Sequence, residues 1–201
     1  LDGLVNNAGM MVLGSVVDTT LEQWRRVHAV NLDGVFLGCK HALPAIERAG
    51  GGAIVNISSI AAMHGVPFVA AYCSSKAAVH SLTDALRMEL APFGIHVVTI
   101  QPGGVRSSFG EHAEAAVRLP ENSLYRPVEP GIRARAQAGQ QGAMAADVFV
   151  VPVVDALLRS SPPRVIRGGT NSVRLPLLKR LLPAAMFDAR LSQLFGLDAL
   201  R

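Results

Sequence analysis

The stretch GGGAIVNISS at residues 50–59 opens a unit that continues through AAYCSSKAAVHSLTDALRMELAPFG (70–94) and HVVTIQPGG (96–104). The first and last stretches are short apolar runs bounded by glycine or proline, which is typical of strands buried on both faces. The middle stretch has the apolar spacing of a helix and ends at Pro92 and Gly94. This order predicts two parallel strands joined by a helical crossover.

The same alternation extends to both ends of the chain. LDGLVNNAG (1–9) predicts a strand that runs into a turn. A helix is predicted from Thr19, where Thr19 and Glu22 form a capping-box pattern, to about Ile46. Loop-rich helical pieces, a helix and a last strand are then predicted at 107–146, 147–160 and 163–169. We therefore expect an α/β fold, a partial doubly wound parallel sheet of about four strands with flanking helices.

Composition indicates a packed globular chain. Half of the 201 residues are hydrophobic and 17% are charged, which excludes a disordered polar chain. No apolar run reaches the ~18 residues of a spanning helix, and the N-terminus lacks the order of a signal peptide. Cys39 and Cys73 lie in predicted helices without metal-ligand spacing, so we expect a reduced, cytoplasmic location.

The net charge of +4 is concentrated near the C-terminus, where eight Lys or Arg and only two acidic residues follow from Arg159 onward. Aromatic residues do not alternate with these charges as in a nucleic-acid groove, so we expect no nucleic-acid partner. The six histidines show no metal-ligand spacing, and we expect them to be structural or exposed and the chain to hold no metal.

Polar residues follow the predicted strands at the edge where parallel α/β sheets bind ligands. They lie in Asn6–Gly9, Ser58–Ser59 and Pro102–Ser107. Tyr72 and Lys76 are four residues apart, so they project from one face of their helix. Taken alone, this pair is more often packing than chemistry.

Five elements in order resemble the short-chain dehydrogenase/reductase family. They are NNAG (6–9), Asn31 in HAVNLDGVF, IVNISS (54–59), Tyr72-x-x-x-Lys76 and PGGV (102–105). Ser59 precedes Tyr72 by thirteen positions, as the catalytic serine of the family does, which favours Ser59 over Ser58. The resemblance extends from residue 1 to about 110. It implies a Rossmann-like fold, with 1–170 as the C-terminal part of a dinucleotide-binding domain.

The resemblance also implies roles for these residues. Tyr72 would be the general acid/base, and Lys76 would lower its pKa and hold the nicotinamide ribose. Ser59 would bind the substrate oxygen, and Asn31 would hold a water that links Lys76 to solvent. The cofactor would be NAD or NADP. The implied cofactor-binding residues are Asn6, Ala8, Gly9, Tyr72, Lys76, Pro102, Gly103, Val105 and Ser107, the last where the family usually has threonine.

The sequence departs from the family at its start. A glycine-rich strand–turn–helix and the residue that selects NAD or NADP do not occur, and Leu1 already lies in what resembles the fourth strand of the family. We therefore expect a partial chain. Its first strand would be an open apolar edge, so the 201 residues should associate or aggregate.

The tail, 171–201, predicts a basic amphipathic helical extension interrupted by Pro176 and Pro183. One interpretation is a helix folded over the core or the substrate mouth, or a subunit contact. The other is a membrane-surface helix, which would make the protein membrane-peripheral and favour an apolar substrate. We favour the first.

Two functional hypotheses follow. The first is an oxidoreductase that transfers hydride between NAD(P) and a secondary alcohol or ketone, with an apolar substrate. The alternative is a truncated, catalytically incompetent remnant that acts as an association module. Family helices corresponding to 20–46 and 72–91 commonly form subunit interfaces, so the resemblance implies a homo-oligomer under either hypothesis.

Overall fold

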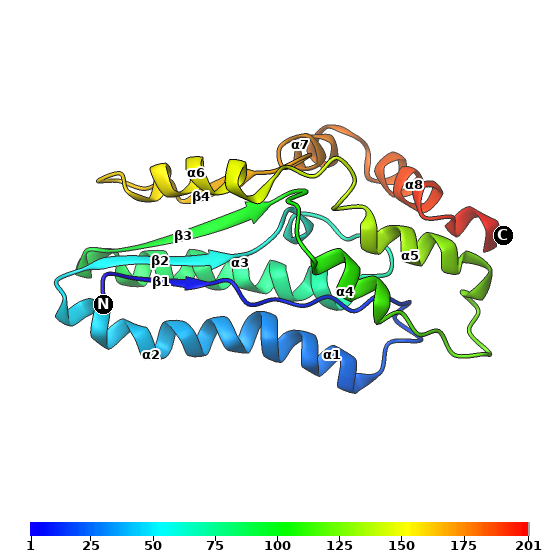
Figure 1. Cartoon of the computed structure of the whole chain (residues 1–201), viewed down its shortest axis with the longest axis horizontal. Coiled ribbons are helices and arrows are strands. Elements are labelled where there is room, and N and C mark those ends of the chain that lie inside the picture. Colours follow the sequence, from blue (N-terminus) through cyan, green and yellow to red (C-terminus); the bar gives the residue numbers. More distant parts are fainter. Residues whose placement is uncertain (201) are drawn as a thin grey trace.

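The computed structural model describes residues 1–200 and contains one parallel sheet. Its strands lie side by side in chain order, each paired in parallel with the next. They are β1 (Gly3–Asn6), β2 (Gly52–Ile57), β3 (Ile95–Pro102) and β4 (Val165–Gly168). Figure 1 shows this sheet with helices on both sides. The predicted fold class, a partial doubly wound sheet of four strands, is confirmed.

Helical segments connect the strands and extend the chain beyond the sheet. Those before β3 are α1 (Leu21–His28), the π-helical segment η1 (Ala29–Asp33), α2 (Gly34–Arg48), the short η2 (Ile60–Ala62), α3 (Ala70–Leu90) and η3 (Ala91–Phe93). Those after it are α4 (Phe109–Ala115), η4 (Arg126–Val128), α5 (Glu129–Gln137), α6 (Ala146–Leu157), α7 (Arg174–Leu181), α8 (Ala184–Leu194) and η5 (Leu197–Leu200).

The capping box of α1 lies one residue later than predicted. The Gln23 backbone N–H donates to the Thr20 hydroxyl at 3.1 Å, and the Thr20 N–H donates to the Gln23 side chain at 2.9 Å. The prediction of Thr19 and Glu22 was wrong because the Thr19 hydroxyl already donates to the Ser15 carbonyl, within the preceding turn. A change of partner in a turn shifts a cap by one residue without altering the helix that follows.

Two layers of helix cover the sheet. On one face, α2 and α3 pack Val35, Cys39 and Val79 against Ile54 and Val97. On the other face, α6 packs Phe149, Val153 and Leu157 against a smaller cluster from β2, β3 and β4. These alternating apolar residues explain why β2 and β3 are buried on both faces, as their continuous apolar sequence predicts.

A third apolar cluster lies beyond the carboxyl ends of the strands, where α4, α5 and the tail meet (Figure 1). Phe195 of the tail is 4% exposed and packs in this cluster with Ile132 of α5. At Gly131 an added Cβ would collide with the Phe195 carbonyl, so the tail lies directly on α5. These contacts favour the packed interpretation of the tail. No helix within residues 1–200 is long and apolar enough to cross a membrane.

β1 is the outer strand of the sheet and pairs only with β2 among the described residues. Its Val5 side chain is 61% exposed. An apolar edge strand is a template for pairing with another chain. The expectation that the 201 residues associate or aggregate stays a prediction, and the exposed valine is the feature that supports it.

The side chain of Asn56 joins three elements in the buried layer between the sheet and α3. It donates to the Thr83 hydroxyl at 3.0 Å and accepts from the Asn6 side-chain amide at 2.8 Å. We expect Asn56→Ala to lower the free energy of unfolding by about 1–3 kcal/mol, because buried polar partners lose their bonds. Urea denaturation measures this. The exposed Asn122→Ala is the control, and equal effects of the two variants would contradict the prediction.

Candidate active site

A large cavity lies at the carboxyl ends of the strands and has a volume of about 780 Å³. Its floor is formed by segments that follow three strands, at 7–9, 58–61 and 102–105. Residues of α3, α4, α5 and the tail form its walls. This is the edge at which open parallel sheets bind ligands, and the size is that of a small-molecule site.

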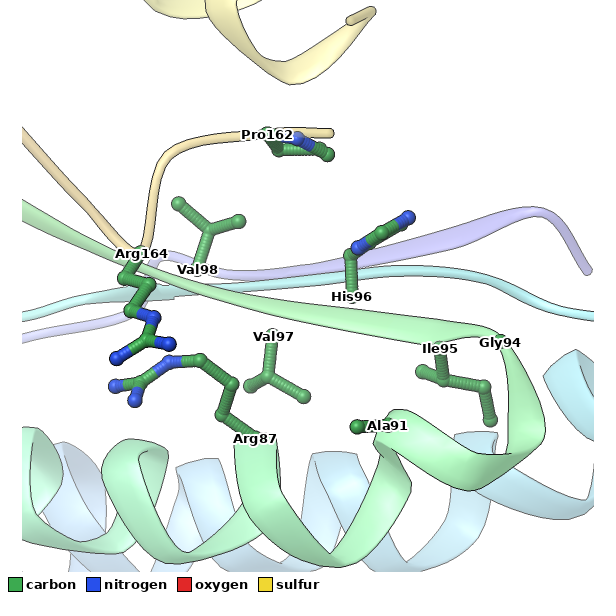
Figure 2. Close-up of a pocket in the computed structure, with 9 residues that line it drawn as sticks. All are labelled: Arg87, Ala91, Gly94, Ile95, His96, Val97, Val98, Pro162 and Arg164. Carbon is green, nitrogen blue, oxygen red and sulfur yellow. The ribbon is translucent and has the colours of Figure 1, made fainter. Parts of the chain in front are cut away.

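A smaller cavity of about 130 Å³ lies at the opposite end of β3. Figure 2 shows that Arg87 of α3 and Arg164, just before β4, point their guanidinium groups toward each other there. Arg87 is ion-paired with Asp84 on its own helix. This cavity contains none of the predicted site residues and lies at the amino end of the strand, so the larger cavity is the candidate site.

The two serines after β2 differ in their hydrogen-bond partners. The Ser58 hydroxyl donates to the Lys76 carbonyl at 2.9 Å, which ties the end of β2 to α3. The Ser59 hydroxyl accepts from the Ala61 N–H at 3.1 Å, caps the short η2 helix and lines the cavity. An accepting hydroxyl keeps its own proton free to donate. Ser59 is therefore the serine that lines the cavity with a hydroxyl able to donate, and its binding of a substrate oxygen stays a prediction.

Tyr72 lies in the first turn of α3 and lines the cavity, with its ring tilted against Phe109 at 5.8 Å between centroids. Burial raises the pKa of its phenol, and hydrogen bonding to Ser59 and the positive charge of Arg135 oppose this rise. The net shift is upward, opposite to the lowering by Lys76 that the resemblance implies. A phenol at this position stays protonated at neutral pH until a further positive charge arrives.

Lys76 is directed along the cavity wall and not only at Tyr72. Its ammonium donates to the Ile57 carbonyl at 2.7 Å, and the side chain lines the cavity. Burial lowers its pKa from 10.5 to about 8, because removal from water penalises the charged form. The lysine is thus a buried cation with one protein acceptor and with room for further acceptors from a ligand.

Asn31 is fully buried in the π-helical segment η1 and does not line the cavity. It binds both backbone groups of Met10, accepting from the N–H at 2.8 Å and donating to the carbonyl at 2.9 Å. It also donates to the Ser75 hydroxyl at 3.0 Å. A π-helical turn widens the helix and turns this side chain inward. In this structure Asn31 anchors the loop after β1, and a water-holding role stays a prediction.

Asn6 also lies outside the cavity. Its side chain donates to Asn56, in the layer between the sheet and α3, and not to a group at the strand ends. The other predicted cofactor residues do line the cavity: Ala8, Gly9, Tyr72, Lys76, Pro102, Gly103, Val105 and Ser107. Position 103 requires glycine for a steric reason, since an added Cβ would collide with the Thr170 carbonyl.

Several cavity residues were not predicted from the sequence. Arg135 of α5 and His64 belong to segments without a motif, and Leu191 and Phe195 come from the tail. The apolar helical spacing of the tail was a signal for the last two, and it supported the interpretation of a helix over the substrate mouth. Nothing in the sequence around Arg135 distinguishes it from an exposed arginine, because tertiary packing alone brings α5 to the cavity.

Comparison with known proteins gives a consistent picture. The family model described as short chain dehydrogenase matches residues 1–117. Trans-4-hydroxycyclohexanecarboxylate dehydrogenase of Sinomonas cyclohexanicum is 47% identical over 107 residues, which are 53% of this chain and 41% of that protein. The matched part therefore spans less than half the length of this relative.

Two solved structures are also similar. A short-chain dehydrogenase from Streptomyces avermitilis has a TM-score of 0.75 and 28% identity, over 99% of this chain and 70% of that one. Gluconate 5-dehydrogenase from Burkholderia cenocepacia J2315, in complex with NADP and tartrate, has a TM-score of 0.54 and 30% identity. That match covers 56% of this chain and 44% of the other.

The lowered pKa of Lys76 makes a prediction about stability and pH. Between pH 8 and 10.5 the folded chain has released the Lys76 proton and the unfolded chain keeps it, so the stability rises with pH in this window. Relative to Lys76→Met, we expect the wild type to gain up to about 1.4 kcal/mol per pH unit. Urea denaturation of the cofactor-free protein at pH 7 to 10 measures this, and a constant difference would contradict it.

Proposed function

The chain belongs to the short chain dehydrogenase family, and from this premise we propose that it acts as an NAD- or NADP-dependent oxidoreductase on a secondary alcohol or ketone. One observation carries the proposal: Ser59, Tyr72 and Lys76 line the same cavity at the carboxyl ends of the strands. These are a hydrogen-bond donor, a proton-transfer group and a cation, the groups that alcohol oxidation requires.

The residues present fit a dinucleotide. The cavity joins the ends of β1, β2 and β3, and its polar groups include Asn7, Lys76 and Ser107. Gly103 and Gly104 bring backbone to its wall, and at both positions an added Cβ would collide with neighbouring backbone carbonyls, of Thr170 and Gly139. A bound nicotinamide would accept or supply the hydride. The solved gluconate 5-dehydrogenase holds NADP, and the present residues do not favour NADP over NAD.

The protein's own residues would handle the proton and the oxygen. Ser59 would donate to the substrate oxygen, and Tyr72 would take the hydroxyl proton during oxidation or return it during reduction. Burial raises the pKa of the phenol and keeps it protonated, so base catalysis needs an added positive charge, which an oxidised nicotinamide and the Lys76 ammonium would supply together. In the reverse direction, ketone reduction, the protonated phenol is already in the form that donates the proton to the substrate oxygen.

The proposed substrate has an apolar body. Met11, Phe109, Leu191, Leu194 and Phe195 form the apolar part of the cavity wall. Such a surface favours a substrate with little polar area around the reacting carbon. A relative whose name gives a substituted cyclohexanol as its substrate supports this size and shape. The alternative of an incompetent association module has no observation in its favour.

Replacement of the tyrosine separates binding from chemistry. We expect Tyr72→Phe to keep cofactor binding and to lower kcat by at least about 100-fold, because the proton-transfer group is lost. Fluorescence titration with NADH and NADPH measures binding, and oxidation of cyclohexanol measures turnover. Tyr125→Phe is the matched control, since Tyr125 packs edge-on against Phe68 and does not line the cavity. Unchanged turnover in Tyr72→Phe would disprove the assigned role.

We also propose a homo-oligomer that forms through the helices near 20–46 and 72–91. Large apolar side chains are exposed on these helices, among them Phe36 and Leu37 of α2 and Met88 of α3. Exposed apolar groups in one region favour an interface between chains. These side chains support the proposal but do not define the symmetry.

Light scattering after gel filtration tests the oligomer. We expect the wild type to be at least a dimer and Phe36→Glu to shift it toward the monomer, because a buried charge destabilises an interface. Val16→Glu, at a residue 75% exposed in a loop outside these helices, should leave the mass unchanged. A monomeric wild type would disprove the proposal.

A further inference from the structure

Arg135 is a partly buried cation without a counter-ion among the described residues. It lies on α5 and lines the large cavity, with its guanidinium carbon 5.9 Å from the centre of the Phe195 ring. Its Nε atom is buried and has no hydrogen-bond partner, and no ion pair within residues 1–200 includes this residue. Burial lowers the pKa of the guanidinium. A buried charge without a partner is costly unless a ligand supplies the opposite charge.

The other arginine of the same helix shows the contrast. Arg133, two residues earlier on α5, binds the Glu129 carboxylate through two nitrogens at 3.1 and 2.7 Å. Its side chain is 42% exposed. The helix therefore provides a carboxylate for the arginine that faces solvent and none for the arginine that faces the cavity.

The basic residues that line the cavity have no acidic lining residue among them. Its ionisable lining residues include His64, Lys76, His112 and Arg135, and none of its lining residues is Asp or Glu. His64 is 7% exposed, and its Nδ1 atom is buried without a hydrogen-bond partner. A pocket with apolar walls and only positive charges concentrates anions. His64 Nδ1 and Arg135 Nε thus both lack a hydrogen-bond partner among the described residues, and both residues line the same cavity.

Arg135 lies on the substrate side of this cavity. Its charge acts on the pKa values of Tyr72, Cys73 and His64, and its ring contact is with Phe195 of the tail. Lys76 instead binds the carbonyl at the end of β2, the side at which the proposed cofactor would contact the strand ends. A bound anion at Arg135 would therefore lie near Tyr72 and Phe195.

We propose that the substrate is a hydroxy acid or keto acid with an apolar body, whose carboxylate binds Arg135. This rests on the proposed function. The planar guanidinium fork matches a carboxylate in two parallel hydrogen bonds, and His64 lines the same cavity. In oxidation the carbinol hydrogen would leave as hydride, which NAD(P)⁺ would accept, the hydroxyl proton would pass to the Tyr72 phenolate, and the carboxylate would be unchanged.

Binding of a non-reacting pair of probes tests the anion site without catalysis. Calorimetry compares the affinity of the protein for cyclohexanecarboxylate and for cyclohexanecarboxamide, which have similar shape and different charge. The sample is the full-length protein as the cell makes it, with and without saturating NAD or NADP. We expect the carboxylate to bind the wild type at least about tenfold more tightly, because its bonds to the guanidinium are charge-assisted. Arg135→Gln should abolish this preference, Arg135→Lys should keep part of it, and Arg133→Gln should keep all of it.

Two binding outcomes would overturn the inference. One is equal affinity of the wild type for the acid and the amide. The other is a preference that survives in Arg135→Gln while the circular dichroism spectrum shows the variant to be folded. A preference lost equally in Arg133→Gln would also overturn it, because the effect would then be one of general charge.

Turnover separates this inference from the proposed function, with the hydroxy acid 4-hydroxycyclohexanecarboxylate and the uncharged cyclohexanol as the two substrates. We expect Arg135→Gln to raise KM for the hydroxy acid at least about tenfold more than KM for cyclohexanol, because only the hydroxy acid has a carboxylate that loses its partner. Equal losses on both alcohols, with a shifted pH profile, would mean that Arg135 acts through Tyr72, and would overturn the substrate assignment. Carboxylate binding without oxidation of either alcohol would support the anion site and contradict the oxidoreductase.

Discussion

The attachment of α3 to the end of β2 is the interaction on which the site depends. The Ser58 hydroxyl binds the Lys76 carbonyl, the Lys76 ammonium binds the Ile57 carbonyl, and the Asn56 amide binds Thr83. These bonds bridge two elements that the chain separates by a loop, and they are buried, so breaking one leaves a polar group without water. They set the distance between the serine that follows β2 and the tyrosine on α3.

Charge is the second constraint. The cavity contains the buried cation Lys76, the partly buried cation Arg135 and no acidic lining residue, while the phenol of Tyr72 has a raised pKa. Such a site is incomplete electrostatically until anions enter it. A bound cofactor would offer hydrogen-bond acceptors to the Lys76 ammonium, and the proposed carboxylate would supply negative charge near Arg135. Binding energy from both would then offset the cost of burying the two cations.

The fold was predictable because each strand carries its own signal. The apolar runs of β2 and β3, bounded by glycines and Pro102, predict buried strands wherever they lie. The cap at Thr20 was missed by one residue because adjacent threonines are equivalent in sequence, and the Ser15 carbonyl decides between them. In the same way, residues 7–9 of the turn after β1 line the cavity, whereas the Asn6 side chain donates to Asn56 and lies outside it.

The sequence by itself determined the order of strands and helices, the stacking of Tyr72 and Lys76 on one helix face, and the family, since these depend on residues close in the chain. Only the tertiary structure decided what completes the cavity. Arg135, His64 and Phe195 come from segments distant from the motifs, and packing of α5 and the tail brings them together. Local periodicity does not encode such contacts, because they depend on the relative placement of whole elements.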